Sequence, residues 1–229
     1  MSFITSPGII VPPLTAGGVA YGTGSQAKVT SAGTVGQVLT SAGAGVPVFT
    51  TLAASSSGLT LVQTVNATPS ASTVVVNGFS ASYNNYKLLV SDVYPSADLR
   101  NFELKFYIAS SLITGNYQYS YVNVSSISAG VSTDAGVDSN STIRLANAMD
   151  QVTFNQSNQY EIDFYAVNGA STFKSIVYNG IYHFLNNSIR IMGAGTQKVT
   201  SGVLTGVEFT YPGSTFGGGK FQLYGYAPT

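Results

Sequence analysis

The sequence contains no cysteine and no tryptophan, and only 8% of its 229 residues are charged. The absence of cysteine excludes a disulfide framework, a thiol nucleophile and a thiolate metal site. Ordinary globular proteins carry roughly 25% charged residues. We therefore expect a surface that Ser, Thr and Asn keep soluble, or one that other copies of the chain cover.

Charge of either sign is also unclustered. Nine basic and nine acidic residues give a formal net charge of zero. No Lys/Arg cluster could follow a phosphate backbone, so nucleic acid is not an expected partner. No apolar run approaches the ~20 residues of a membrane-spanning helix. The N-terminus lacks a positive segment and is interrupted by Pro7, Pro12 and Pro13, so it is not expected to be a secretory signal.

The sequence also lacks helical periodicity: no segment shows a convincing apolar stripe with a 3.6-residue repeat. Short segments rich in Val, Ile, Tyr, Phe and Thr recur instead, separated by turn signals such as Asn168-Gly169 and Pro212-Gly213. They predict an all-β fold with an antiparallel β-sandwich or jelly roll of about eight to ten core strands. The predicted strands are Leu61–Asn66, Thr73–Phe79, Tyr86–Val93, Asn101–Ile108, Tyr117–Val124, Thr142–Leu145, Gln151–Phe154, Tyr160–Val167, Phe173–Phe184, Ser188–Met192, Gly202–Thr210 and Lys220–Tyr226.

The chain divides into three predicted parts. Residues 1–15 form an apolar, proline-rich arm, for which we expect extended backbone. Residues 16–60 form a Gly/Ser/Thr-rich segment that ends in a serine-rich linker, and residues 61–229 form the β-sandwich head. The arm is predicted to dock onto another protein of a large assembly, although it could instead fold back on its own domain. The candidate anchoring residues are Phe3, Ile4, Ile9, Ile10, Val11 and Leu14.

The segment from Ala16 to Thr50 consists of short β-steps, each closed by glycine, with Lys28 as its single charge. Side chains this small cannot build a globular core alone, so we expect the segment to be ordered by copies of itself. Gly22-Thr23-Gly24-Ser25 followed by Lys28 superficially suggests a phosphate loop. It lacks the Gly-x-x-x-x-Gly-Lys spacing and the following helix that such a loop needs.

The same segment resembles one that recurs in bacteriophage tail fibres and related virion proteins. The matching residues are Gly17 to Ser25, Gly33-Thr34, Gly36 to Ser41 and Gly45-Val46-Pro47-Val48-Phe49. Phe49 stands where Trp is more usual in those proteins. The C-terminal Gly219 to Gly225 likewise resembles the closing strand of phage fibre head domains, which lies inside the sandwich near the trimer axis. The resemblance implies a homotrimer in which the segment supplies shaft or shoulder strands.

Two carboxylates and one histidine are the candidates for catalysis. Glu161 and Asp163 lie on one face of a predicted strand, about 7 Å apart by strand rise, a separation that could suit an inverting glycosidase. The alternative, which we favour, is the solvated face of a half-buried strand. His183 is the single histidine. It could serve a Ser–His–acid triad, although no Gly-x-Ser-x-Gly elbow is present, or three copies could bind a metal on a trimer axis. A hydrogen-bonded strand or loop histidine is the simpler interpretation, and no enzymatic activity is expected.

The turn-rich stretch from Ser125 to Ser141 is predicted to be an uncharged, mobile loop. Its Asp134 and Asp138 could hold calcium through oxygen ligands, but the full EF-hand pattern is absent. No cofactor is expected.

The tyrosines are the remaining candidates for binding, because the chain has fifteen and we expect a sandwich core to need fewer. Tyr combines apolar area with a polar handle, which suits subunit interfaces and, together with Asn, sugar recognition. Several tyrosines are predicted near strand ends or turns, where binding residues concentrate: Tyr83, Tyr86, Tyr94, Tyr117, Tyr119, Tyr121, Tyr178, Tyr182 and Tyr211. The candidate receptor contacts are Asn116, Tyr117, Tyr119, Tyr121, Asp134 and Asp138.

These observations and the resemblance together predict a non-enzymatic, homotrimeric bacteriophage fibre, assembled in the bacterial cytoplasm and located in the virion. Its N-terminus would bind a tail, baseplate or capsid protein, and its head would contact a host-surface glycan. One alternative is a capsid fibre or decoration protein without a receptor. The enzyme alternative is a surface-polysaccharide hydrolase, although the chain has no room for a long β-helical body.

Overall fold

A computed structural model describes residues 16–23, 26–51, 58–126, 130–151, 158–185, 187–198 and 201–227. The arm residues Phe3, Ile4, Ile9, Ile10, Val11 and Leu14 lie outside these ranges, as do residues 152–154 of one predicted strand. The chain forms two compact units, Met1–Ser55 and Ser56–Thr229. Each unit is described by itself below.

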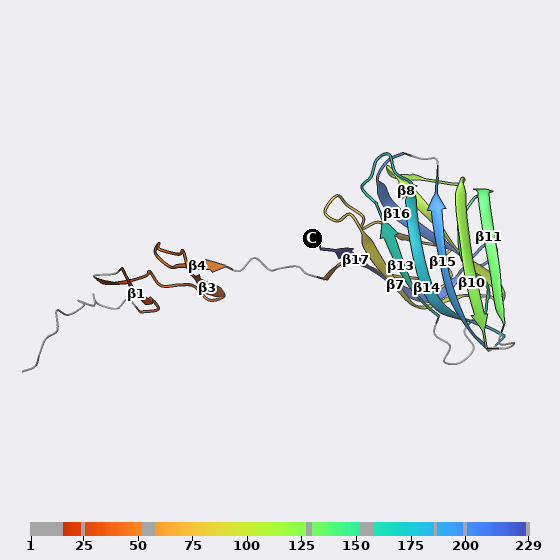
Figure 1. The fold of residues 1–229 in the computed structure, drawn as a ribbon. Helices are drawn as coiled ribbons and strands as arrows, with labels where there is room; N and C mark the ends of the chain where they lie inside the picture. The colour runs from red at the N-terminus through yellow and green to blue at the C-terminus, as the bar shows by residue number, and fades with distance from the viewer. Residues whose placement is uncertain are drawn as a thin grey trace, which may run out of the picture. The chain divides into compact units, whose positions relative to one another are not determined.

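All regular structure in the described residues is β-strand, so the all-β prediction is confirmed (Figure 1). The strands of the first unit are β1 (Ala20–Gly22), β2 (Ala27–Val29), β3 (Gln37–Thr40) and β4 (Val48–Thr51). Those of the second unit are β5 (Leu59–Asn66), β6 (Thr73–Val76), β7 (Tyr86–Pro95), β8 (Arg100–Ile108), β9 (Ser111–Leu112), β10 (Tyr117–Ser125), β11 (Val131–Asn140), β12 (Ile143–Met149), β13 (Gln159–Tyr165), β14 (Lys174–Phe184), β15 (Asn187–Gln197), β16 (Leu204–Thr210) and β17 (Phe216–Tyr226).

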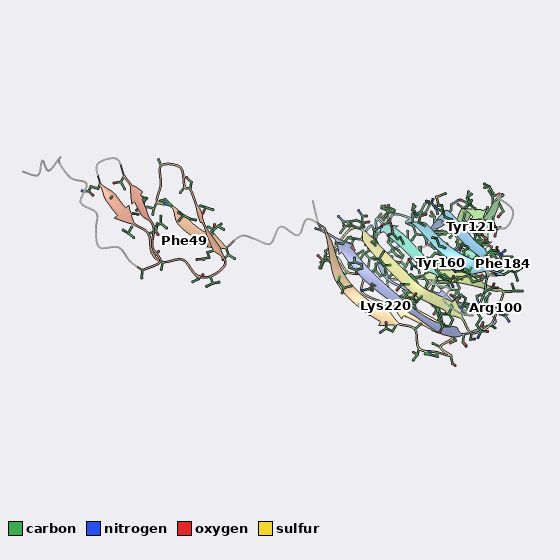
Figure 2. The ribbon with its side chains drawn as sticks, turned by 90° about the horizontal axis from the view of Figure 1, so that it is seen from below. Phe49, Arg100, Tyr121, Tyr160, Phe184 and Lys220 are labelled. Atoms are coloured by element: carbon green, nitrogen blue, oxygen red, sulfur yellow. The ribbon has the colours of Figure 1, made fainter. Side chains whose placement is uncertain are left out.

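The first unit consists of two antiparallel pairs, β1 with β2 and β3 with β4. Its described residues bury almost nothing: Thr30 alone is buried, while Val35, Val46 and Val48 are exposed. The ring of Phe49, labelled in Figure 2, provides an aromatic packing contact, because it lies close to Gly33. The described residues of the two hairpins are therefore held by hydrogen bonds, including those of the Thr30 and Thr40 side chains, and by this aromatic contact rather than by a core.

The second unit, here called the head, contains two antiparallel sheets that share one core. The larger sheet has the order β11-β10-β15-β14-β13-β7-β17-β5, and the smaller has β12-β8-β16-β6 with β9 paired to β8. Figure 1 shows β7, β13, β14, β15, β10 and β11 side by side, with β8 and β16 on the other side of the core. β17 lies between β7 and β5, so the C-terminal strand is internal to the larger sheet.

Aromatic rings join the two sheets. Phe209 of β16 lies 4.9 Å from Phe221 of β17, measured between ring centroids. Phe102 of β8 lies 5.4 Å from Tyr160 of β13, and such pairs contribute beyond their buried area. The predicted apolar face of Phe102, Leu104, Phe106 and Ile108 is confirmed, because all four side chains are buried. Along β8 these four side chains lie on one face, which packs in the core, while Lys105 and Tyr107 of the other face are only partly buried.

Two sequence expectations are wrong. The stretch predicted as a mobile loop contains β11, which pairs with β10 over most of its length. β11 is an edge strand that covers little of the core, so it needs few bulky side chains. Its Ser, Thr, Gly and Asp residues therefore have the composition of a loop. The described part of the head also has thirteen strands, β5 to β17, rather than the eight to ten expected. β9 and β11 are the two that were not among the predicted strands.

Candidate functional site

The nine tyrosines predicted near strand ends or turns are mostly core residues, which corrects the expectation that a core needs fewer of them. Those with buried side chains are Tyr86, Tyr117, Tyr119, Tyr121, Tyr178, Tyr182 and Tyr211, while Tyr83 and Tyr94 are half-buried. Several of their hydroxyls are hydrogen-bonded within the head, as in Tyr86, Tyr121 and Tyr178. Tyr117 donates to the carbonyl of Ile113 at 3.0 Å and accepts from the Phe106 amide at 2.8 Å. Burial raises the pKa of Tyr117 above its usual value.

Of the candidate receptor contacts, Tyr117, Tyr119 and Tyr121 alternate along β10 and point into the head. Their rings therefore offer a receptor very little surface. Asn116 precedes the strand in an exposed, left-handed turn conformation with φ of 62°. Asp138 belongs to β11, but its side chain lies outside the described ones. Asp134 is half-buried at the edge of the core.

Asp134 is bound by the protein itself. It accepts hydrogen bonds from the Tyr121 hydroxyl at 2.9 Å and from Arg144 Nη1 at 3.0 Å. Arg144 also lies 3.9 Å from Glu103 and 5.9 Å from the centroid of the Tyr119 ring. This network of five side chains, with Arg144 at its centre, joins β12 and β8 to β10 and β11. Asp134 is therefore the ion-pair partner of Arg144. Among the described residues, no group of three or more His, Asp or Glu could hold a metal ion.

A shallow trough crosses the outer face of the larger sheet over β11, β10, β15 and β14. It offers about 640 Å³, a size that fits a small-molecule or oligosaccharide ligand. Cross-strand pairing brings its floor together: Val122 lies opposite Met192, and Met192 lies opposite Asn179. Val177 and Met192 are about half exposed. The floor is therefore mainly apolar, with the Asn179 amide within it. Tyr121 and Asp134 border the trough, but the Tyr121 side chain is buried and Asp134 is bound to Tyr121 and Arg144.

A second trough of about 580 Å³ continues this surface toward β13, β7 and β17 and shares Asn179 with the first. Its lining is more polar. The exposed side chains that bear on a ligand are Gln159, Glu161, Asn179, Ile181 and Arg190, and Gln222 is half-buried beside them. Apart from Glu161, sequence reasoning missed these positions. The available signal was the second apolar face of β14, where Val177 and Ile181 alternate with the buried Ile176, Tyr178 and Tyr182.

Glu161 and Asp163 lie on this outer face, as expected for the polar face of a half-buried strand. Lys87 Nζ bridges them, at 3.3 Å from Glu161 and 3.2 Å from Asp163. The Tyr226 hydroxyl donates to Asp163 at 2.6 Å. An inverting pair needs one carboxyl group in an environment that keeps it protonated, whereas here one ammonium group contacts both carboxyl groups. The geometry supports an ion-pair cluster better than a glycosidase pair.

His183 is held at the end of β14 by buried Asn158. The Oδ1 atom of Asn158 lies 2.9 Å from the His183 amide nitrogen and 3.1 Å from His183 Nδ1. The opposite ring nitrogen, Nε2, lies 3.4 Å from the hydroxyl of Ser188 on β15. Burial lowers the pKa of His183, against the opposing effect of Asp150. The expected hydrogen-bonded strand histidine is therefore present, and it contacts a serine that the sequence did not single out.

A scan against protein-family models and searches of the curated proteins and of the solved structures found no match to this chain. Among the described residues, no helix is long and apolar enough to span a membrane.

Proposed function

We propose that the chain is a bacteriophage virion fibre that assembles as a homotrimer, attaches to the particle through its N-terminal arm and contacts the host surface with its head. The observation that carries the proposal is the first unit. It has the glycine-punctuated sequence of phage fibres, yet its described residues form hairpins with exposed valines and almost no buried side chains. Such hairpins need a neighbour to cover them, and further copies of the same segment supply one.

The head fits the receptor-binding part of this proposal. Its two antiparallel sheets suit a sandwich of the jelly-roll kind, and its closing strand β17 is internal to the larger sheet. The two troughs offer an apolar floor with amides, a guanidinium group and a carboxylate around it. A saccharide presents both an apolar ring face and hydroxyls, so a host glycan is the ligand class that this surface favours.

Adsorption tests the receptor role. Purified protein should bind host cells and compete with the virus for them. Val177→Asp places a charge in the floor of the first trough and should abolish competition. Binding the apolar face of a ligand would remove water from the new carboxylate, which costs free energy. Leu99→Asp is the matched control, since Leu99 is comparably exposed but lines neither trough. Wild-type protein that neither binds cells nor competes would favour a capsid decoration protein without a receptor.

A further inference from the structure

The hairpin of β14 and β15 places one histidine and one serine side by side on the outer face of the larger sheet. His183 pairs with Ser188 in the register, one step before the pair Phe184 and Asn187. The flanking Tyr182 and Ile189 point into the core, so His183 and Ser188 point outward. The next outward pair along these strands is Ile181 with Arg190, which lines the second trough.

The hydrogen bonds of Asn158 determine which nitrogen of His183 carries the proton. Asn158 Nδ2 donates to the carbonyl of Val93 at 2.8 Å, so its Oδ1 atom is the acceptor that faces His183. An amide oxygen can only accept, so Nδ1 of the ring is the protonated nitrogen at 3.1 Å. Nε2 then presents a lone pair to the Ser188 hydroxyl. Asn158 is fully buried, which fixes the amide and hence the ring.

Arg190 supplies the remaining charge. It follows Ser188 by two residues on the same strand and the same face, a Cα spacing of about 7 Å that an extended arginine can reach across. Its side chain is exposed, and within the described part of the chain no hydrogen bond or ion pair holds the guanidinium group. A free cation beside a serine can stabilise an oxyanion that forms there.

We propose that Ser188, His183 and Arg190 form an esterase site, with Asn158 as the positioning residue, that removes small acyl groups such as acetate from an alcohol bound along the second trough. A nucleophile within reach of a base that a third group orients is the general signature of acyl transfer. Ser188 is exposed and, among the described residues, lines neither trough, so a small acyl group fits best. This reaction goes beyond the attachment role and depends on neither the trimer nor the receptor.

The reaction proceeds in two balanced steps. Ser188 Oγ forms a bond to the ester carbonyl carbon while its proton passes to His183 Nε2, and Arg190 stabilises the carbonyl oxygen as it becomes anionic. The bond from carbon to the alcohol oxygen then breaks, and His183 returns the proton to the departing alcohol, leaving an acyl-serine. A water molecule gives a proton to His183 Nε2 while its oxygen forms a bond to the acyl carbon. The bond from that carbon to Ser188 Oγ then breaks and His183 returns the proton to Oγ, which releases the carboxylic acid and restores Ser188 and His183.

The experiment uses the full chain with p-nitrophenyl acetate and a fluorophosphonate probe. We expect hydrolysis above the buffer rate, with at least 100-fold loss in Ser188→Ala and His183→Gln, and a single covalent phosphonate on the peptide that contains Ser188. Ser175→Ala is the matched control, because Ser175 lies on the same face of β14 but pairs with Thr196, and it should retain full activity. The absence of labelling at Ser188, or equal rates in wild type and Ser188→Ala, would overturn the proposal while leaving adsorption unaffected.

The positioning role of Asn158 is tested by the tautomer of His183, which a change in stability alone would not alter. His183 is the single histidine, so the ¹⁵N shifts of its imidazole are unambiguous and should show protonated Nδ1 in the wild type. Asn158→Ala should populate the other tautomer and lower the rate, whereas Asn158→Asp should restore protonated Nδ1 because a carboxylate also accepts. Protonated Nε2 in the wild type would contradict the assigned roles.

Discussion

A Cβ atom added to Gly33 would lie 2.6 Å from the ring of Phe49. Real Cβ atoms do not approach other atoms so closely, so the glycine and the ring require each other. The contact joins the segment before β3 to β4 and is an aromatic packing contact within the described residues of the first unit. It explains why glycine occupies this point of the segment and why the residue at position 49 must be large and flat.

Gly33→Ala should therefore loosen the hairpins of the first unit without changing the head. We expect faster amide hydrogen exchange in β3 and β4, with the unfolding midpoint of the head unchanged. Gly22→Ala is the control, because a Cβ there meets nothing within 4 Å and the φ angle is ordinary. Equal exchange in both variants would show that Phe49 does not pack on Gly33.

Arg144→Met should destabilise the head by about 1–3 kcal/mol. The change leaves Asp134 and Glu103 without their cation in a half-buried site, and an uncompensated acid costs more than the pair contributes. Partial exposure of Arg144 and Asp134 keeps the expected loss below that of a fully buried pair. Urea denaturation measures it, with Lys220→Met as a solvent-exposed control. A loss below about 0.5 kcal/mol would mean that the network does not hold β11 to the head.

Lys174→Met should also destabilise the head, by about 1–3 kcal/mol, because it removes a buried charged donor that binds three loop carbonyls. The buried Lys174 ammonium donates to the carbonyls of Ala166, Gly169 and Thr172 and so closes the loop between β13 and β14. Thermal unfolding and exchange of the loop amides measure the effect. Unchanged protection of this loop would contradict the assigned contact.

Alkaline pH should unfold the head cooperatively. Burial raises the pKa of Tyr160 and Tyr211 well above the usual value. Burial and a hydrogen bond to Asp163 raise the pKa of Tyr226 to about 12. Above about pH 10 the unfolded chain has lost tyrosine protons that the folded chain retains, so the free energy of unfolding falls as pH rises.

Tyrosinate absorbance and circular dichroism should therefore change together in an alkaline titration. Tyr160→Phe removes one retained proton, so its stability should decline less steeply with pH. Tyrosinate that forms at pH 10 while the dichroism stays constant would mean that the rings are exposed, contrary to their position in the core.

The strands of the head were largely predictable because alternating bulky residues, as in Phe102 to Ile108, report a buried face directly. β11 was not predictable, since an edge strand built from Ser, Thr, Gly and Asp has the composition of a loop. Which strands pair with one another also could not be predicted, because the pairing joins residues that are far apart in the sequence. Asn158 and Ser188 lie 30 residues apart in sequence, and only the pairing of β13, β14 and β15 brings them to the same histidine.

For the tyrosines, the sequence analysis predicted a binding role where the structure has core residues. Their amphipathic character suggested exposed contacts, but the head satisfies several of their hydroxyls internally, as with Tyr178, which donates to the Arg144 carbonyl at 2.9 Å. A sequence does not reveal whether a polar handle finds its partner in the core or in a ligand. The outer face, by contrast, was detectable from Val177 and Ile181, which are apolar at positions where an ordinary exposed face would be polar.

The mass of the full chain in solution tests the central claim most directly. Light scattering of the purified protein should give three times the 23.8 kDa of one chain, because the described residues of the first unit bury almost nothing and three copies would cover the exposed valines. A mass near 23.8 kDa at micromolar concentration would contradict the homotrimeric fibre.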